Sequence, residues 1–217
     1  ATFTNFAMSG IDKVHFGLEA AVSIPIYHTL ALNGAVSWGQ YTYDSNPYYL
    51  QTQDNSGDIV SDGYVYWKDF RVESTPQTAV NVGLSWRSNN NIYLSADFNY
   101  YNNMYLSMSP IYRTDAVITG GMAPGDIEHL RRQEKFDSAY TLNASIGKNW
   151  YIHRKYTLGF SLDVKNILNN QDIKTGGYEQ TRLSKNTETT VTTYQAFDSK
   201  YFYMFGTTYY LNLYFRF

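Results

Sequence analysis

Apolar and polar residues alternate over most of the chain, and seven segments keep that alternation for eight residues or more. A strict alternation of this kind predicts β-strands, because successive side chains of a strand point to opposite faces. The expected strands are residues 14–24, 30–39, 80–87, 92–101, 140–147, 156–165 and 209–217. The sequence therefore predicts an all-β, antiparallel architecture.

The last segment, residues 209–217, shows the pattern most clearly. One of its two expected faces carries Tyr209, Leu211, Leu213, Phe215 and Phe217. The other face carries Tyr210, Asn212, Tyr214 and Arg216. An amphipathic terminal strand that ends on Phe resembles the insertion signal of bacterial outer-membrane β-barrels.

The links between the expected strands alternate between short and long. Short links lie near residues 25–28, 88–91 and 151–154, whereas long ones cover roughly 43–78, 105–137 and 166–203. Short turns at one end and long loops at the other are typical of outer-membrane barrels, whose strands cross the membrane with about 9–11 residues. We leave open whether residues 63–72 form a further strand pair or fold back within a loop.

Composition narrows the class of protein. The chain has 217 residues, of which 18% are aromatic, with 22 Tyr, and only 17% are charged. Tyr suits a water–lipid boundary, because its ring is apolar and its hydroxyl is polar. The net charge of −2 argues against a nucleic-acid partner, and the absence of Cys excludes a disulfide framework.

The sequence contains no apolar run long enough for a membrane-spanning helix, and no catalytic fingerprint. The four His residues fall in different segments without the spacing of metal ligands. We therefore expect no catalytic residue, no cofactor and no metal, and classify the chain as a non-enzyme.

Strand direction predicts that this chain is part of something larger. If the short links are periplasmic, the last strand ends in the periplasm, and counting back places residues 1–13 on the side of the long loops. A complete bacterial barrel has an even number of strands and both ends in the periplasm. About seven strands that start on the outer side would form only the C-terminal portion of a larger barrel, spanning residues 1–217.

Several short motifs resemble the C-terminal end of TonB-dependent outer-membrane transporters. The run Asn166-Ile167-Leu168-Asn169 is similar to the Asn-Leu-Phe/Leu-Asn run that often ends the penultimate strand in that family. The segment from Gly10 to Glu19 resembles its recurrent entry from a loop into a strand. Within that family, the motifs most resemble those of the SusC-like and carboxypeptidase-regulatory-domain receptors of Bacteroides-like bacteria.

The resemblance implies a localisation, a mechanism and partners. Family members are barrels of about 22 strands closed by an N-terminal plug, located in the bacterial outer membrane with the long loops extracellular. They take up nutrients such as glycans, siderophores, peptides or cobalamin with energy from the TonB complex. The implied partners are outer-membrane lipid, the rest of the barrel with its plug, the TonB complex, and a SusD-like surface lipoprotein acting as a lid. Plug and TonB box are absent from this chain.

Aromatic and basic side chains in the expected loops are candidate ligand contacts. Aromatic rings offer flat apolar surfaces to sugars or peptides, and guanidinium groups bind anions. The candidates are Tyr48, Tyr49, Tyr66, Trp67, Tyr112, Arg113, Arg131, Arg132 and Tyr178. Glu128 and Arg132 are spaced to pair on a short helix.

Two other functions fit the same pattern. A secreted or surface Tyr-rich β-sandwich that binds glycans would show the same alternation, with its apolar faces buried against each other. A passive porin-like channel would have a similar wall but neither plug nor energy coupling.

Overall fold

The computed structural model describes residues 3–73, 75–120, 124–153, 155–186 and 193–217. Most of these residues lie in β-strands, and the strands within each sheet pair antiparallel. The all-β, antiparallel class predicted from the sequence is therefore confirmed.

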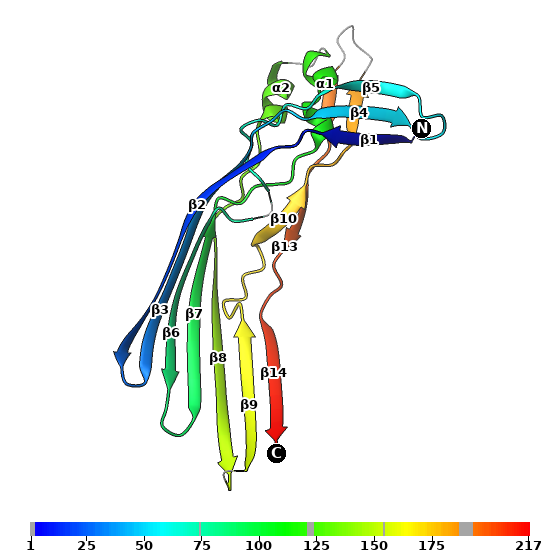
Figure 1. Ribbon diagram of the computed structural model, residues 1–217. Helices are drawn as coiled ribbons and strands as arrows, with labels where there is room; N and C mark the ends of the chain where they lie inside the picture. Colours follow the sequence, from blue (N-terminus) through cyan, green and yellow to red (C-terminus); the bar gives the residue numbers. More distant parts are fainter. Residues whose placement is uncertain (1–2, 74, 121–123, 154, 187–192) are drawn as a thin grey trace.

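The largest element is a seven-stranded sheet, which we call the wall sheet. Each of the seven expected segments contributes one of its strands. They are β2 (Lys13–Tyr27), β3 (Leu30–Tyr43), β6 (Thr78–Arg87), β7 (Ile92–Asn102), β8 (Ala139–Ile152), β9 (Tyr156–Lys165) and β14 (Thr208–Arg216). They lie side by side in the order β14-β9-β8-β7-β6-β3-β2, so each strand pairs with the next one of the sheet along the chain (Figure 1).

Three wall strands continue three residues or more past the ends of their expected segments. β2 passes through Pro25 to Tyr27, β3 reaches Tyr43 and β8 reaches Ile152. Pro25 is tolerated because β2 is an edge strand and its pairing with β3 is irregular between Pro25 and Tyr27. The link expected at residues 25–28 is thus reduced to a tight turn around His28 and Thr29.

Short and long connections lie at opposite ends of the wall sheet. The tight turns β2–β3, β6–β7 and β8–β9 lie at the lower end in Figure 1, together with the C-terminus. All remaining elements gather at the upper end, and we call them the loop cap. This arrangement matches the alternation of short and long links in the sequence.

The loop cap contains ordered structure where the sequence analysis expected loops. Its strands are β1 (Thr4–Ser9), β4 (Tyr48–Gln53), β5 (Ile59–Tyr64), β10 (Lys174–Tyr178), β11 (Leu183–Asn186), β12 (Thr193–Ala196) and β13 (Lys200–Tyr203). They form one sheet in the order β1-β4-β5 and two pairs, β10-β13 and β11-β12. Of residues 63–72, Gly63 and Tyr64 end β5 and pair with Tyr49 and Tyr48 of β4. After Tyr64 the chain folds back through isolated bridges such as Thr42–Arg71.

The helices of the described residues all lie in the loop cap. They are a 3₁₀ turn (Pro110–Arg113), α1 (Asp115–Thr119) and α2 (Pro124–Arg131). None of the helices in the described part of the chain has the length and apolarity needed to cross a membrane.

The wall sheet is open. β2 and β14 form its two edges, and neither outer edge has a strand partner among the described residues. The described residues thus form no closed barrel. Unpaired strand edges expose backbone N–H and C=O groups that normally find partners.

The buried core lies in the loop cap and at its junction with the wall sheet. One cluster contains Tyr43, Tyr49, Val65, Trp67 and Met108. Two further clusters are built around Leu106 with Phe136 and around Tyr112 with Leu130. The large side chains in the middle of the wall sheet belong to none of these clusters.

Candidate functional site

One face of the wall sheet is apolar from edge to edge, and we call it the apolar face. Directly opposed residues of antiparallel strands share a face, so the register defines this surface. Leu32 lies opposite Leu84, for example, and Phe98 lies opposite Leu142. Its larger side chains include Phe16, Leu18, Val22, Val36, Trp38, Val82, Leu84, Trp86, Leu94, Phe98, Tyr140, Ile146, Trp150, Leu158, Phe160, Leu162, Leu211, Leu213 and Phe215.

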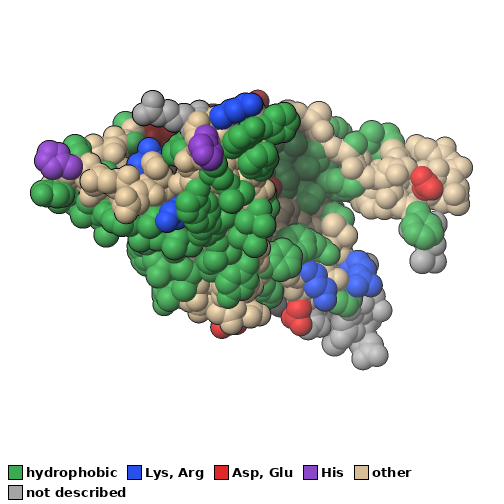
Figure 2. Space-filling view, turned by 90° about the horizontal axis from the view of Figure 1, so that it is seen from below, with side chains coloured by type: hydrophobic (Ala, Val, Ile, Leu, Met, Phe, Trp, Pro, Cys, Tyr) green, Lys and Arg blue, Asp and Glu red, His purple; other side chains and the backbone are tan. Residues whose placement is uncertain are grey.

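Most of these side chains are exposed, and the others are half-buried. Leu18 is 69% exposed on β2, Val82 is 47% exposed on β6 and Leu213 is 70% exposed on β14. Seen from below, hydrophobic side chains dominate the central part of the molecular surface (Figure 2). Apolar patches that extend over many residues mark surfaces that contact a membrane or another protein.

The strand predicted to carry an insertion signal lies at one edge of this surface. Tyr209, Leu211, Leu213, Phe215 and Phe217 are all more than half exposed. Tyr209, Leu211, Leu213 and Phe215 lie opposite Val164, Leu162, Phe160 and Leu158 of β9, so the edge strand continues the apolar face.

Aromatic residues lie toward both ends of the apolar face. Toward the loop cap, Phe16 packs edge-on against Trp38, and Phe98 stacks with Tyr140. Toward the tight turns, Trp150 contacts Phe160, and Tyr156 stacks on Phe215. Trp150 and Tyr140 are ten residues apart on β8, which is ~33 Å along an extended strand. A tilt of roughly 40° would reduce that separation to ~25 Å across a membrane.

One charged side chain, Lys148, lies on the apolar face within the described wall strands. Its Nζ is 5.2 Å from the centre of the ring of Trp150, one of the aromatic residues near the tight turns. A Lys at this position can extend its ammonium group toward water along an amphipathic ring.

On the opposite face, which we call the polar face, polar side chains form hydrogen bonds from strand to strand. Asn33 accepts a bond from Ser23 at 2.7 Å and donates to Ser85 at 3.2 Å. Asn81 donates to Asn99 at 2.8 Å, and Ser95 pairs with Ser145 at 2.8 Å. Glu19, Asp97, Asp163 and Arg216 share this face. The sheet therefore separates an apolar surface from a polar one.

Tyr rings cover glycines on the polar face. Tyr93 lies opposite Gly147 and Tyr214 lies opposite Gly159, and a Cβ added to either glycine would overlap the ring. A ring laid over a strand glycine shields backbone that would otherwise be open, and it fixes the register.

Four of the nine candidate ligand contacts are buried in the loop cap. Tyr49, Trp67, Tyr112 and Arg113 are between 1% and 6% exposed. Tyr49 stacks on Phe6, Trp67 packs on Tyr43, and the Tyr112 hydroxyl donates to the backbone oxygen of Arg182 at 2.9 Å. These side chains pack inside the cap, and of the four only Arg113 also lines a cleft among the described residues.

Arg113 is bound to Glu179 within the cap. Its two terminal nitrogens lie 2.5 Å and 2.8 Å from the Glu179 carboxylate, and they also donate to the backbone oxygens of Ser109 and Arg132. Glu179 accepts a further bond from the Ser109 amide at 2.8 Å. No sequence pattern pointed to Glu179, because it lies 66 residues away from Arg113 along the chain.

The other five candidates lie at the surface of the cap. The hydroxyls of Tyr48 and Tyr66 bind the carboxylates of Asp62 and Asp115. Arg132 pairs with Glu128 at 2.9 Å, which confirms the spacing inferred from the sequence. Arg131 lines a cleft, and Tyr178 packs against Phe202. The structure therefore distributes these residues over several parts of the cap.

A second ionic group within the cap joins β10 and β13 to the segment between α2 and β8. Glu134 accepts bonds from Lys174 at 3.0 Å and from the Tyr201 hydroxyl at 2.8 Å. Burial and the Glu134 carboxylate raise the pKa of Tyr201. Burial lowers the pKa of Lys174, but its bond to Glu134 outweighs that effect and leaves it raised.

Among the residues described, no three His, Cys, Asp or Glu side chains come together as metal ligands. A scan against protein-family models and searches of curated proteins and solved structures found no match.

Proposed function

We propose that this chain forms part of the wall of a transmembrane β-barrel in the bacterial outer membrane. The observation that carries the proposal is the exposed apolar face, which is continuous over seven strands and has a hydrogen-bonded polar face behind it. In an outer-membrane barrel, apolar side chains contact lipid and polar ones line the lumen.

Two further features support a membrane wall. Aromatic residues flank the apolar face ~33 Å apart along a strand, and a tilt of roughly 40° would match this separation to the ~25 Å band of such barrels. The free edges of β2 and β14 are suited to pair with further strands, because backbone groups in lipid must be satisfied within the protein.

The transporter class rests on the sequence resemblance. We infer that the barrel is a TonB-dependent receptor of about 22 strands with a plug in its lumen. In this proposal the loop cap is extracellular and captures a nutrient, the plug rearranges under the action of the TonB complex, and a SusD-like lipoprotein covers the cap. The chain itself performs no chemistry on the ligand.

Fractionation of cells that produce the full-length protein tests the proposal. We expect recovery of residues 1–217 in the outer membrane, release by detergent but not by alkaline carbonate, and upstream peptides from a plug region in the same band. A species of ~25 kDa in the soluble fraction would overturn the proposal and favour the glycan-binding sandwich. A membrane band without a plug would instead indicate a passive channel.

A further inference from the structure

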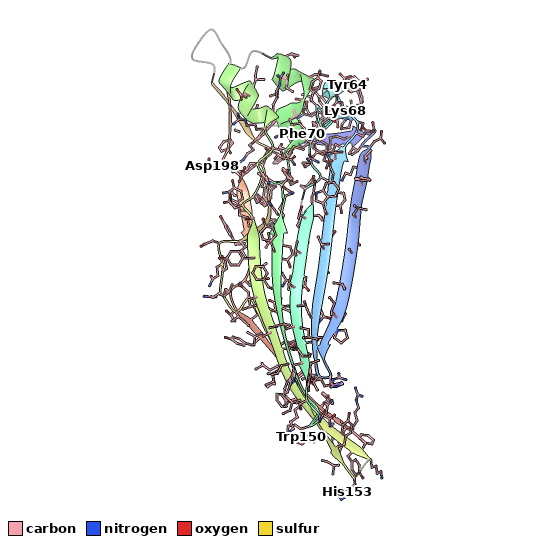
Figure 3. The ribbon with its side chains drawn as sticks, turned by 90° about the vertical axis from the view of Figure 1, so that its left-hand side faces the viewer. Tyr64, Lys68, Phe70, Trp150, His153 and Asp198 are labelled. Atoms are coloured by element: carbon pink, nitrogen blue, oxygen red, sulfur yellow. The ribbon has the colours of Figure 1, made fainter. Side chains whose placement is uncertain are left out.

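A cleft of about 640 Å³ lies in the loop cap. It is lined by Tyr66, Lys68 and Phe70 from the segment after β5, by Arg131 at the end of α2, and by Arg113. Figure 3 places Lys68 and Phe70 among the elements above the wall sheet. Its volume falls within the range of small-molecule sites, ~300–1,000 Å³.

Two exposed cations from separate elements line the cleft. Lys68 lies 4.0 Å from Asp44, with both side chains more than half exposed, so water screens this pair strongly. Arg131 follows Leu130, which is buried in the cap core and so anchors the end of α2. Asp69 is the acidic residue of the lining, so the exposed side chains of the cleft carry more positive than negative charge.

Arg113 adds a buried donor to the same cleft. The side chain is 1% exposed, and its terminal nitrogens are bound to Glu179, Ser109 and Arg132. Its Nε has no hydrogen-bond partner among the described residues. A buried donor without an acceptor is unfavourable, and a ligand oxygen would satisfy it.

We propose that this cleft binds an oxyanion, either a carboxylate or a phosphate, carried by a small ring-shaped ligand. Lys68 and Arg131 would neutralise its charge, and Arg113 Nε would donate to one of its oxygens. The rings of Tyr66 and Phe70 provide apolar surface beside these groups. This proposal rests on the proposed function, since the ligand would be the nutrient that the cap captures.

Calorimetry on the detergent-purified full-length protein tests the proposal with three probes. Tri-galacturonate carries carboxylates on sugar rings, its methyl ester has the same rings without charge, and inorganic phosphate is the bare anion. We expect tri-galacturonate or phosphate to bind, the ester to bind at least tenfold more weakly, and higher salt to weaken binding.

Variants locate the binding to the cleft. Lys68→Gln and Arg131→Gln should each weaken binding about tenfold or more, because each removes a charged contact. Arg131→Lys should recover part of the loss. Arg132→Gln is the matched control, since Arg132 is adjacent in sequence but pairs with Glu128, and its affinity should stay unchanged.

Equal losses in the Arg131→Gln and Arg132→Gln variants, equal binding of ester and acid, or no binding of either anion would each overturn the proposal. Outer-membrane recovery of the same variants is scored separately. A protein that reaches the outer membrane but binds no anion contradicts the cleft proposal alone. Specific anion binding by a soluble protein would contradict the proposed function and retain the cleft.

Discussion

Leu213 lies four residues from both Tyr209 and Phe217, in the middle of the last wall strand. Replacing it with Arg places a charge near the centre of the proposed lipid-facing band, at a cost of ~2–4 kcal/mol. We expect the Leu213→Arg variant to show that loss in its free energy of unfolding, measured by urea titration in lipid vesicles.

Asn212 provides the matched control, because it lies on the polar face opposite Ser161. The Asn212→Arg variant should stay close to the native stability. Similar losses in the two variants would contradict the assignment of the faces.

A second prediction concerns Gly147, which is covered by the ring of one neighbour, Tyr93. A methyl group at this position would force the ring away, and overpacking of this kind typically costs ~1–3 kcal/mol. We expect Gly147→Ala to reduce stability by about that amount in the same titration.

Gly34→Ala serves as the control, because the nearest atom to its added methyl, Cγ1 of Val22, would lie at 3.5 Å. That distance is an ordinary contact, so we expect little loss. A double variant, Gly147→Ala with Tyr93→Ala, should recover part of the stability if the ring is the cause. No recovery would argue against it.

At the scale of elements, the Arg113–Glu179 pair joins the 3₁₀ turn to the segment after β10. Glu179→Gln leaves a buried guanidinium without its carboxylate, and breaking such pairs costs ~3–5 kcal/mol. We expect faster hydrogen exchange at residues 110–119 in this variant, measured by mass spectrometry, while exchange in the wall strands stays unchanged.

Glu128→Gln is the corresponding surface change. The Glu128 and Arg132 side chains are 71% and 78% exposed, and exposed pairs of this spacing contribute only ~0.3–0.5 kcal/mol. Exchange at residues 110–119 should therefore stay native. Faster exchange in both variants would indicate that the cap does not depend on the buried pair.

The wall strands could be predicted from the sequence and most of the loop cap could not. Alternation such as Leu94-Ser95-Ala96-Asp97-Phe98 predicts both the strand and the residues on each of its faces, because each wall strand has one apolar and one polar side. β4 and β5 lack this signal. Tyr48 and Tyr49 are adjacent and alike in the sequence, yet Tyr48 is 41% exposed and Tyr49 is 1% exposed.

The candidate site was predicted less well than the fold, for a related reason. Composition drew attention to Tyr112 and Arg113, but their burial follows from contacts with Arg182 and Glu179, far away along the chain. Lys68, a lining residue of the cleft, was missed because a single Lys in a loop carries no pattern. Arg131 was identified because it is a guanidinium group in an expected loop, where it can bind an anion.

At the scale of the whole molecule, the orientation of the wall sheet in the membrane can be tested. The chain has no Cys, so single cysteines introduced by substitution can report which end faces the outside. Ser56 lies in the turn between β4 and β5 at the cap end, and Asn90 lies in the tight turn between β6 and β7. With a membrane-impermeant maleimide, Ser56→Cys should be labelled on intact cells, whereas Asn90→Cys should be labelled only after permeabilisation.

The reverse result would invert the proposed orientation. Labelling of both positions on intact cells would contradict a membrane-spanning wall.

The pairing order of the wall sheet has a consequence for the way it folds. β2–β3, β6–β7 and β8–β9 are hairpins closed by tight turns, so their partners are near neighbours along the chain. Contacts between near neighbours form quickly, because little chain entropy is lost in closing a short loop. The wall can therefore grow by addition of preformed hairpins. The slow steps are the pairings β3–β6, β7–β8 and β9–β14, because a long segment of the cap separates the two strands of each pair along the chain.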